Sequence, residues 1–134
     1  MKSQGKTILI VDSDKEHRER TTRILRGSGF RVLEARGYRD GENVWQLHRS
    51  EIALLVTAMV LPDRNGYELT DRIRSVNPAV KVLFISGATG ALISEFHDKK
   101  LAGTDTLFRP FEPSELVRKV MALLENGLSS AATL

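Results

Sequence analysis

The sequence lacks cysteine, has few aromatic residues and contains no long apolar run. The absence of cysteine excludes disulfides and thiolate metal sites, so nothing in the chain requires an oxidising compartment. The apolar stretch nearest the amino terminus, Ile8 to Val11, is too short for a signal peptide or a membrane span. We therefore predict a cytoplasmic protein that does not associate with membranes.

Neither the basic nor the acidic residues are concentrated in one segment of the chain. The 134 residues include 20 basic and 17 acidic ones, a formal net charge of +3, and the basic residues are scattered without interleaved aromatics. This distribution argues against nucleic-acid binding. A chain of this length suits one domain and leaves no room for a second. We expect the domain to span residues 1–126 and to be followed by a short frayed C-terminal tail, 127–134.

Short apolar runs rich in Ile, Val and Leu alternate with longer amphipathic stretches along the chain. This alternation is typical of buried parallel strands joined by crossover helices. It predicts an α/β fold, a doubly wound five-stranded parallel sheet with five helices in the flavodoxin-like strand order 2-1-3-4-5. The predicted strands are 7–11, 31–35, 53–57, 81–86 and 106–108.

Helix boundaries follow from capping residues. Asp14 suits an N-cap, Pro113 suits the first turn of a helix, and Asn126-Gly127 predicts a helix end. The predicted helices are 14–26, 41–49, 65–76, 91–100 and 113–125.

In sheets of this kind, ligands bind beyond the carboxyl ends of the strands. The segments that meet there are 12–14, 57–62, 86–90 and 108–111. The glycine-rich segment 86–90 resembles a phosphate-binding loop, but connecting loops commonly use glycine, and we favour a plain loop. The histidines are widely separated and have no matched ligand spacing, which argues against a zinc site.

Several motifs at the predicted sheet edge resemble those of one known family. They are Asp12-Ser13-Asp14, the segment from Leu61 to Leu69 with its Pro62 and Gly66, the serine Ser86 at the end of the fourth strand, and Phe108-Arg109-Pro110-Phe111. Over residues 6–126 the chain resembles the receiver domain of two-component response regulators. In that family, an acidic pair after the first strand and an aspartate that ends the third strand bind Mg²⁺, and this aspartate accepts a phosphoryl group. The resemblance implies that the corresponding positions of this chain would form the same site.

The chain departs from the family pattern at the residues that carry this chemistry. Ala58 stands at the phosphoacceptor position, and a methyl group cannot attack phosphorus. Ser13 replaces the second acidic residue, so any Mg²⁺ would be held weakly by Asp12 and Asp14, and the expected role of Asp14 is the N-cap. Thr57 is a poor substitute nucleophile because adjacent strand residues point to opposite faces and no activating base is visible.

The remaining site positions are partly kept. Arg109 stands where the family has lysine, and we predict that it pairs with Asp12 and takes the space of the metal. Ser86 matches the hydroxyl that follows the phosphoryl group during switching. Thr106 stands where many receivers have an aromatic switch residue. Arg109-Pro110 matches a peptide bond that receivers hold cis.

These residues together predict a stand-alone receiver-like signalling module that is not an enzyme, requires no cofactor beyond weak Mg²⁺, and acts by docking to proteins. The partners implied are a histidine kinase, another regulator, or a second copy bound through the fourth helix, fifth strand and fifth helix. One alternative is a conventional phospho-acceptor whose native aspartate was replaced by Ala58, although Ser13 and Arg109 argue against a single replacement. A remote alternative is a nucleotide- or flavin-binding enzyme on the same fold, which the carboxylates of Asp12 and Asp14 disfavour because they would repel phosphate.

Overall fold

The computed structural model describes residues 6–87 and 102–132, with side chains as far as Glu125. The strands in these ranges are β1 (Thr7–Val11), β2 (Arg31–Ala35), β3 (Ile52–Ala58), β4 (Lys81–Ser86) and β5 (Thr104–Phe108). The helices in the same ranges are α1 (Lys15–Gly27), α2 (Tyr38–His48), α3 (Gly66–Val76) and α5 (Pro113–Ala132). The helix predicted over 91–100 lies outside the described residues.

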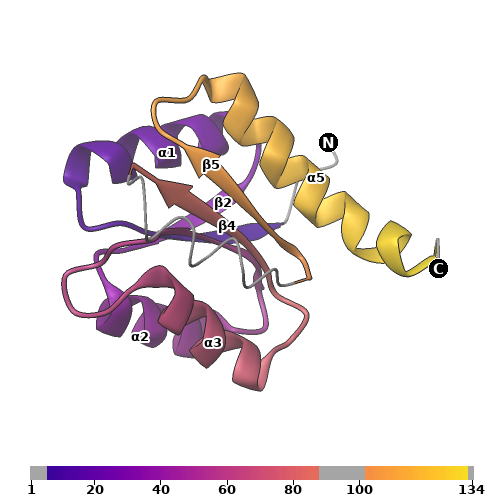
Figure 1. Ribbon diagram of the computed structural model, residues 1–134, viewed down its shortest axis with the longest axis horizontal. Coiled ribbons are helices and arrows are strands. Elements are labelled where there is room, and N and C mark those ends of the chain that lie inside the picture. Colours follow the sequence, from indigo (N-terminus) through magenta and orange to yellow (C-terminus); the bar gives the residue numbers. More distant parts are fainter. Residues whose placement is uncertain (1–5, 88–101, 133–134) are drawn as a thin grey trace.

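The sheet confirms the predicted architecture. The strands are parallel and lie in the order β2-β1-β3-β4-β5. Helices α1 and α5 cover one face of the sheet, and α2 and α3 cover the other (Figure 1). Because neighbouring strands are parallel, the carboxyl ends of β1, β3 and β4 lie side by side at one end of the sheet, and the strand order reverses between β1 and β3.

The two faces of the sheet carry separate apolar cores. Ile8 and Ile10 of β1 belong to the core beneath α1 and α5, whereas Leu9 and Val11 belong to the core beneath α2 and α3. Alternate residues of a strand point to opposite faces, so burial on both sides requires the continuous apolar run seen in the sequence. Trp45, the single tryptophan of the chain, is fully buried in the α2 and α3 core.

Helices α1 and α3 begin where the sequence predicts, and each has a polar cap. The carboxylate of Asp14 accepts a hydrogen bond from His17 N at 2.9 Å. The Asn65 side chain accepts from Glu68 N at 2.8 Å, while the Glu68 carboxylate accepts from Asn65 N at 3.2 Å. This reciprocal capping box satisfies amide groups that the first turn of a helix leaves without intrahelical partners.

Helix α2 begins at Tyr38, earlier than the predicted start at Gly41. Gly37 occupies the N-cap position and has no side chain with which to cap the helix. The cap comes from Asp63, in the loop between β3 and α3, whose carboxylate accepts from Tyr38 N at 2.9 Å and from Arg39 N at 3.1 Å. The predicted start was wrong because the capping residue is distant in the sequence.

Helix α5 continues to Ala132, past the end predicted at Asn126-Gly127, so most of the predicted tail is helical. Glycine in a helix costs about 1 kcal/mol relative to alanine, which weakens a helix but need not end it. No proline follows Gly127 to enforce a stop. No helix in the described part of the chain is both long and apolar enough to cross a membrane.

The first residue of α3, Gly66, lies directly against the end of β3. Its N–H donates to Met59 O at 2.8 Å. A Cβ built at this position would lie 2.4 Å from Ala58 O and 3.0 Å from Thr57 Cγ2. Only glycine therefore fits here, and its presence sets the distance between α3 and the end of β3.

Replacing Gly66 with alanine should destabilise the protein by roughly 1–3 kcal/mol, the usual cost of overpacking. Gly27→Ala is the matched control, because a Cβ there meets nothing within 4 Å and alanine favours the helix by about 0.5–1 kcal/mol over glycine. Urea unfolding followed by Trp45 fluorescence measures both variants. Equal stability of the two would contradict the close approach of α3 to β3.

Candidate functional site

Residues from four strands meet where those strands end. Asp12 follows β1, Ala58 ends β3, Ser86 ends β4 and Arg109 follows β5. Arg109 N donates to Ser86 O at 2.9 Å, which continues the pairing of β4 and β5 beyond the sheet. The fold therefore brings together at one edge the main site residues predicted from the sequence.

Ala58 places a methyl group at the centre of this edge. It is buried, with 7% of its surface exposed, and it belongs to the apolar core beneath α2 and α3. The neighbouring Thr57 is fully buried, and its hydroxyl donates to Ala58 O at 2.9 Å. The end of β3 thus offers no carboxylate, and its one hydroxyl is already bonded to the main chain.

Asp12 and Arg109 form the predicted ion pair. Arg109 Nη2 donates to Asp12 Oδ2 at 2.7 Å, and the side chains are 22% and 11% exposed respectively. The other carboxylate oxygen of Asp12 accepts from Asp14 N at 3.0 Å. Both oxygens of this largely buried carboxylate are therefore engaged, one by a cation and one by the main chain.

The arginine reaches its partner across two strands. Arg109 follows the edge strand β5 and Asp12 follows β1, so β4 and β3 lie between them. The side chain passes close to Gly87, where a built Cβ would lie 3.3 Å from Arg109 Nη1. We infer that the guanidinium lies across the end of β3, the strand that carries Ala58.

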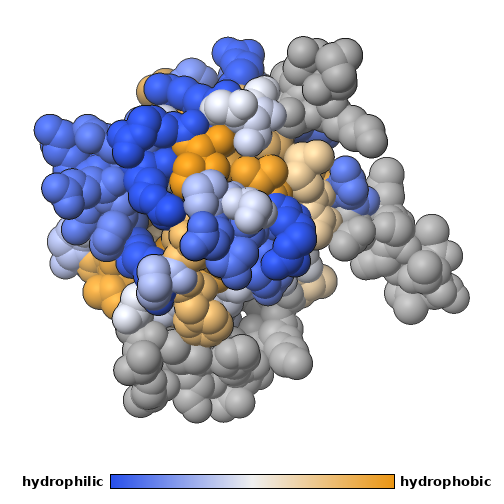
Figure 2. Space-filling view, turned by 90° about the horizontal axis from the view of Figure 1, so that it is seen from above, coloured by the Kyte–Doolittle hydropathy of each residue, from blue (hydrophilic) through white to orange (hydrophobic). Residues whose placement is uncertain are grey.

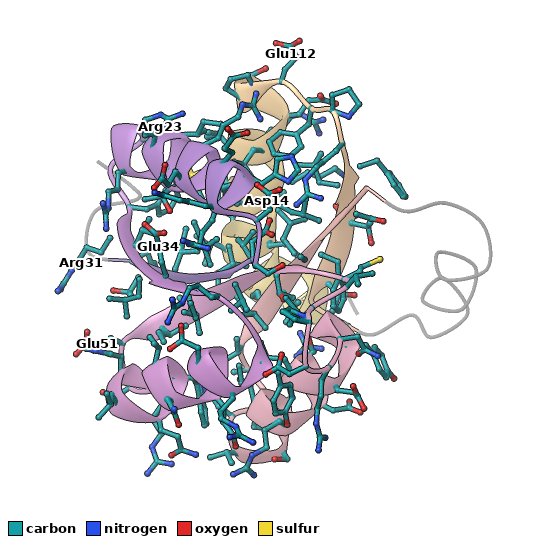
Figure 3. The ribbon with its side chains drawn as sticks, turned by 90° about the vertical axis from the view of Figure 1, so that its left-hand side faces the viewer. Asp14, Arg23, Arg31, Glu34, Glu51 and Glu112 are labelled. Atoms are coloured by element: carbon teal, nitrogen blue, oxygen red, sulfur yellow. The ribbon has the colours of Figure 1, made fainter. Side chains whose placement is uncertain are left out.

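The oxygen donors present do not fit a Mg²⁺ site. Asp14 lies at the amino end of α1 (Figure 3), where its exposed carboxylate caps the helix. Asp12 is paired with Arg109, and Ser13 has no carboxylate. In the described ranges, no three His, Asp or Glu side chains cluster so that they could hold a metal. Mg²⁺ requires an octahedral set of oxygens with carboxylates among them, and the side chains described at this end of the sheet do not supply such a set.

Comparison with known proteins agrees with this geometry. Residues 8–121 match the family profile described as the response regulator receiver domain. The chain belongs to this family. It is 32% identical over 128 residues to the transcriptional regulatory protein GltR of Pseudomonas aeruginosa, an alignment that covers 95% of this chain and 52% of that protein. It is 26% identical over 120 residues to the response regulator receiver protein CpdR of Brucella abortus, covering 89% and 97% respectively.

Solved receiver structures share the fold. A CheY-like receiver domain protein from Methanospirillum hungatei JF-1 has a TM-score of 0.79 at 27% identity, with 93% of this chain and 98% of that chain covered. The chain spans about half the length of transcriptional regulators such as GltR, whose matched share is 52%.

The remaining receiver positions keep their places in the fold. Ser86 is 2% exposed at the end of β4, and Thr106 on β5 is half-buried opposite Phe84 of β4. The Arg109-Pro110 bond is cis, as the family resemblance predicts. Ser86 and the loop after β5 therefore lie at the same end of the sheet as Ala58.

Two arginines of α1 contribute contacts that the sequence alone did not indicate. Arg18 donates from Nη1 to Asp12 O at 2.8 Å and from Nε to Glu34 at 2.9 Å. Glu34 lies on β2, beneath α1 in the view of Figure 3. Arg20 donates from Nη2 to Phe111 O at 3.0 Å, and its guanidinium carbon lies 5.0 Å from the centroid of the Phe111 ring. These contacts join α1 to both loops that carry the ion pair.

Two capping carboxylates have lowered pKa values. The backbone N–H groups of Tyr38 and Arg39 lower the pKa of Asp63 below its usual 3.8, and the backbone N–H of His17 does the same for Asp14. Each hydrogen bond favours the ionised carboxylate, so both residues stabilise the fold in their charged form.

Loss of the ion pair should destabilise the receiver. Arg109→Met leaves the largely buried Asp12 carboxylate without its cation, and we expect a loss of roughly 1–3 kcal/mol, less than for a fully buried pair. A double-mutant cycle with Asp12→Asn, measured by urea unfolding, isolates the pairwise energy. Strictly additive effects of the two substitutions would contradict a direct interaction.

The helix caps predict a pH dependence of a definite sign. A lowered folded-state pKa contributes stability that is present above the unfolded value, about 3.9 for aspartate, and is lost as the pH falls through the folded value. Asp63→Asn should therefore reduce the unfolding free energy most at neutral pH. The difference from the parent protein should shrink below about pH 4. A difference that stays constant through this range in urea unfolding would contradict an ionised cap.

Proposed function

We propose that this receiver acts by docking to a protein partner and is not switched by aspartyl phosphorylation. The observation that carries the proposal is the Arg109 guanidinium, paired with Asp12 across the end of a strand that has Ala58 at the acceptor position. We also propose that the protein is cytoplasmic and is not an enzyme, as the sequence predicts.

The first support is the missing nucleophile. Formation of an aspartyl phosphate requires a carboxylate oxygen to attack phosphorus, and Ala58 has only a methyl group. Thr57 does not replace it, because its buried hydroxyl is bonded to Ala58 O and no base lies beside it among the contacts described. Transfer of a phosphoryl group to β3 therefore has no acceptor atom.

The second support is electrostatic. Phosphoryl transfer in this family relies on a divalent cation that bridges acidic side chains and phosphoryl oxygens. Here the charge of Asp12 is already balanced by Arg109 at 2.7 Å. A ligand can shift a conformational equilibrium only if it binds one of the two conformations more tightly than the other. With Asp12 already paired, we expect Mg²⁺ to bind this site weakly in both conformations. Regulation then rests on partner binding or on protein abundance.

A protein partner fits the character of the surface. Viewed from the side of α1 and α5, the surface has an apolar area near its centre with hydrophilic side chains along much of its border, and further apolar areas lie lower in the view (Figure 2). Ile24, Val117 and Met121 pack partly buried against the core beneath these two helices. Phe108 at the end of β5 is 44% exposed. We propose a histidine kinase or another regulator as partner, or a second copy bound through β5, α5 and the helix predicted over 91–100.

One alternative deserves a direct test. A conventional phospho-acceptor in which the native aspartate was replaced by Ala58 would keep the rest of its site intact. Ser13 and Arg109 weigh against this reading because both alter the donor set independently of Ala58. A nucleotide- or flavin-binding role has less support, because carboxylates of Asp12 and Asp14 follow β1 where such folds bind phosphate.

Beryllofluoride or acetyl phosphate with Mg²⁺ should leave the amide spectrum of the protein unchanged, because it has neither nucleophile nor metal site. The amide spectrum of Ala58→Asp should also stay unchanged, because we expect Arg109 to pair with the new carboxylate. Adding Ser13→Asp and Arg109→Lys to Ala58→Asp should restore a response.

The three proteins are compared by two-dimensional NMR and by incorporation of phosphate from acetyl phosphate. A site-specific response of the unaltered protein would overturn the proposal. A full response of Ala58→Asp alone would mean that Ser13 and Arg109 are not disabling, and would favour the replaced-aspartate alternative.

A further inference from the structure

The first turn of α2 is held by the loop between β3 and α3. Asp63 accepts from Tyr38 N at 2.9 Å and from Arg39 N at 3.1 Å, one with each carboxylate oxygen. The guanidinium carbon of Arg64 lies 5.0 Å from the centroid of the Tyr38 ring, a cation–π geometry. We call Asp63, Arg64, Tyr38 and Arg39 the α2 clasp.

The loop side of the clasp is short and tightly bonded. Leu61 N donates to Arg64 O at 3.1 Å, and Gly66 N donates to Met59 O at 2.8 Å. Asn65 caps α3 immediately after the clasp. Asp63 and Arg64 thus lie in a compact turn that begins at the end of β3 and stops at α3. A displacement of either end of the turn therefore moves the capping carboxylate.

The remainder of α2 is held by different contacts. Trp45 is fully buried, and Gly41 is packed so closely that an added Cβ would lie 3.1 Å from Val11 Cγ2. The clasp, in contrast, is at the surface: Asp63, Arg64 and Arg39 are exposed and Tyr38 is half-buried. The first turn can therefore lose its cap without removal of the body of α2 from the core.

We propose that the α2 clasp makes the first turn of α2 and the β3–α3 loop open and close together as one local unit. Such a unit gives this receiver a conformational transition beside the acceptor position that requires no phosphoryl group. It goes beyond the proposed docking function and does not depend on it, because no member of the clasp takes part in the Asp12–Arg109 pair.

Amide hydrogen exchange measured by NMR on the full chain tests this coupling. Asp63→Ala removes the cap, and Gly37→Ala perturbs the clasp without changing charge, since its Cβ would lie 3.0 Å from Asp63 Oδ1. Exchange of the Tyr38 and Arg39 amides should accelerate at least tenfold in both variants. The Leu61 amide, on the loop side, should accelerate with them, while the amides of Trp45 and Val11 keep their protection.

Asp71→Ala is the matched control, because it removes an aspartate from the exposed side of α3 without touching the clasp. It should leave the Tyr38 and Arg39 amides unchanged. Acceleration at Tyr38 and Arg39 without any change at Leu61 would overturn the coupled opening. Acceleration of equal size at Trp45 and Val11 would also overturn it, because α2 would then open only with the whole domain.

Discussion

The ion pair between Asp12 and Arg109 is the contact on which the rest of the site depends. It joins the loop after β1 to the loop after β5 across two intervening strands, with both side chains largely buried. A buried charge is costly unless it is paired. If either residue bound a metal or a phosphoryl group instead, the other would be left as an unpaired, largely buried charge. The pair thus holds the loop after β1 and the loop after β5 together at the carboxyl end of the sheet.

The surroundings of the pair are held by charged contacts of the same kind. Arg18 and Arg20 tie α1 to the main chain at Asp12 and at Phe111. On the other side of the sheet, Asp63 ties the loop after β3 to the first turn of α2. The loops after β1 and β5 are therefore held against α1, whereas the loop after β3 is tied to α2 by surface contacts. These contacts support the proposal that the receiver acts by docking to a partner.

The sequence predicted the fold well because buried parallel strands leave a strong apolar signal on both faces, as in β1. It also predicted that Asp12, Ala58, Ser86 and Arg109 lie together, since their positions follow from the ends of the strands. The sequence-based prediction was wrong or silent where a residue distant in the sequence determines a helix boundary or a contact. The start of α2 depends on Asp63, and the contact of Arg20 with Phe111 joins residues 91 positions apart. The predicted end of α5 was wrong because glycine weakens a helix without stopping it.

The most direct measurement of the central claim is a titration of the unaltered protein with Mg²⁺ followed by the amide signals of the sheet edge. If Arg109 takes the place of the metal, the signals of Asp12, Ser13 and Ala58 should not shift at millimolar Mg²⁺ beyond the effect of an equal ionic strength of NaCl. Saturable shifts confined to these residues would contradict the account, because they would show that a cation displaces Arg109 from Asp12.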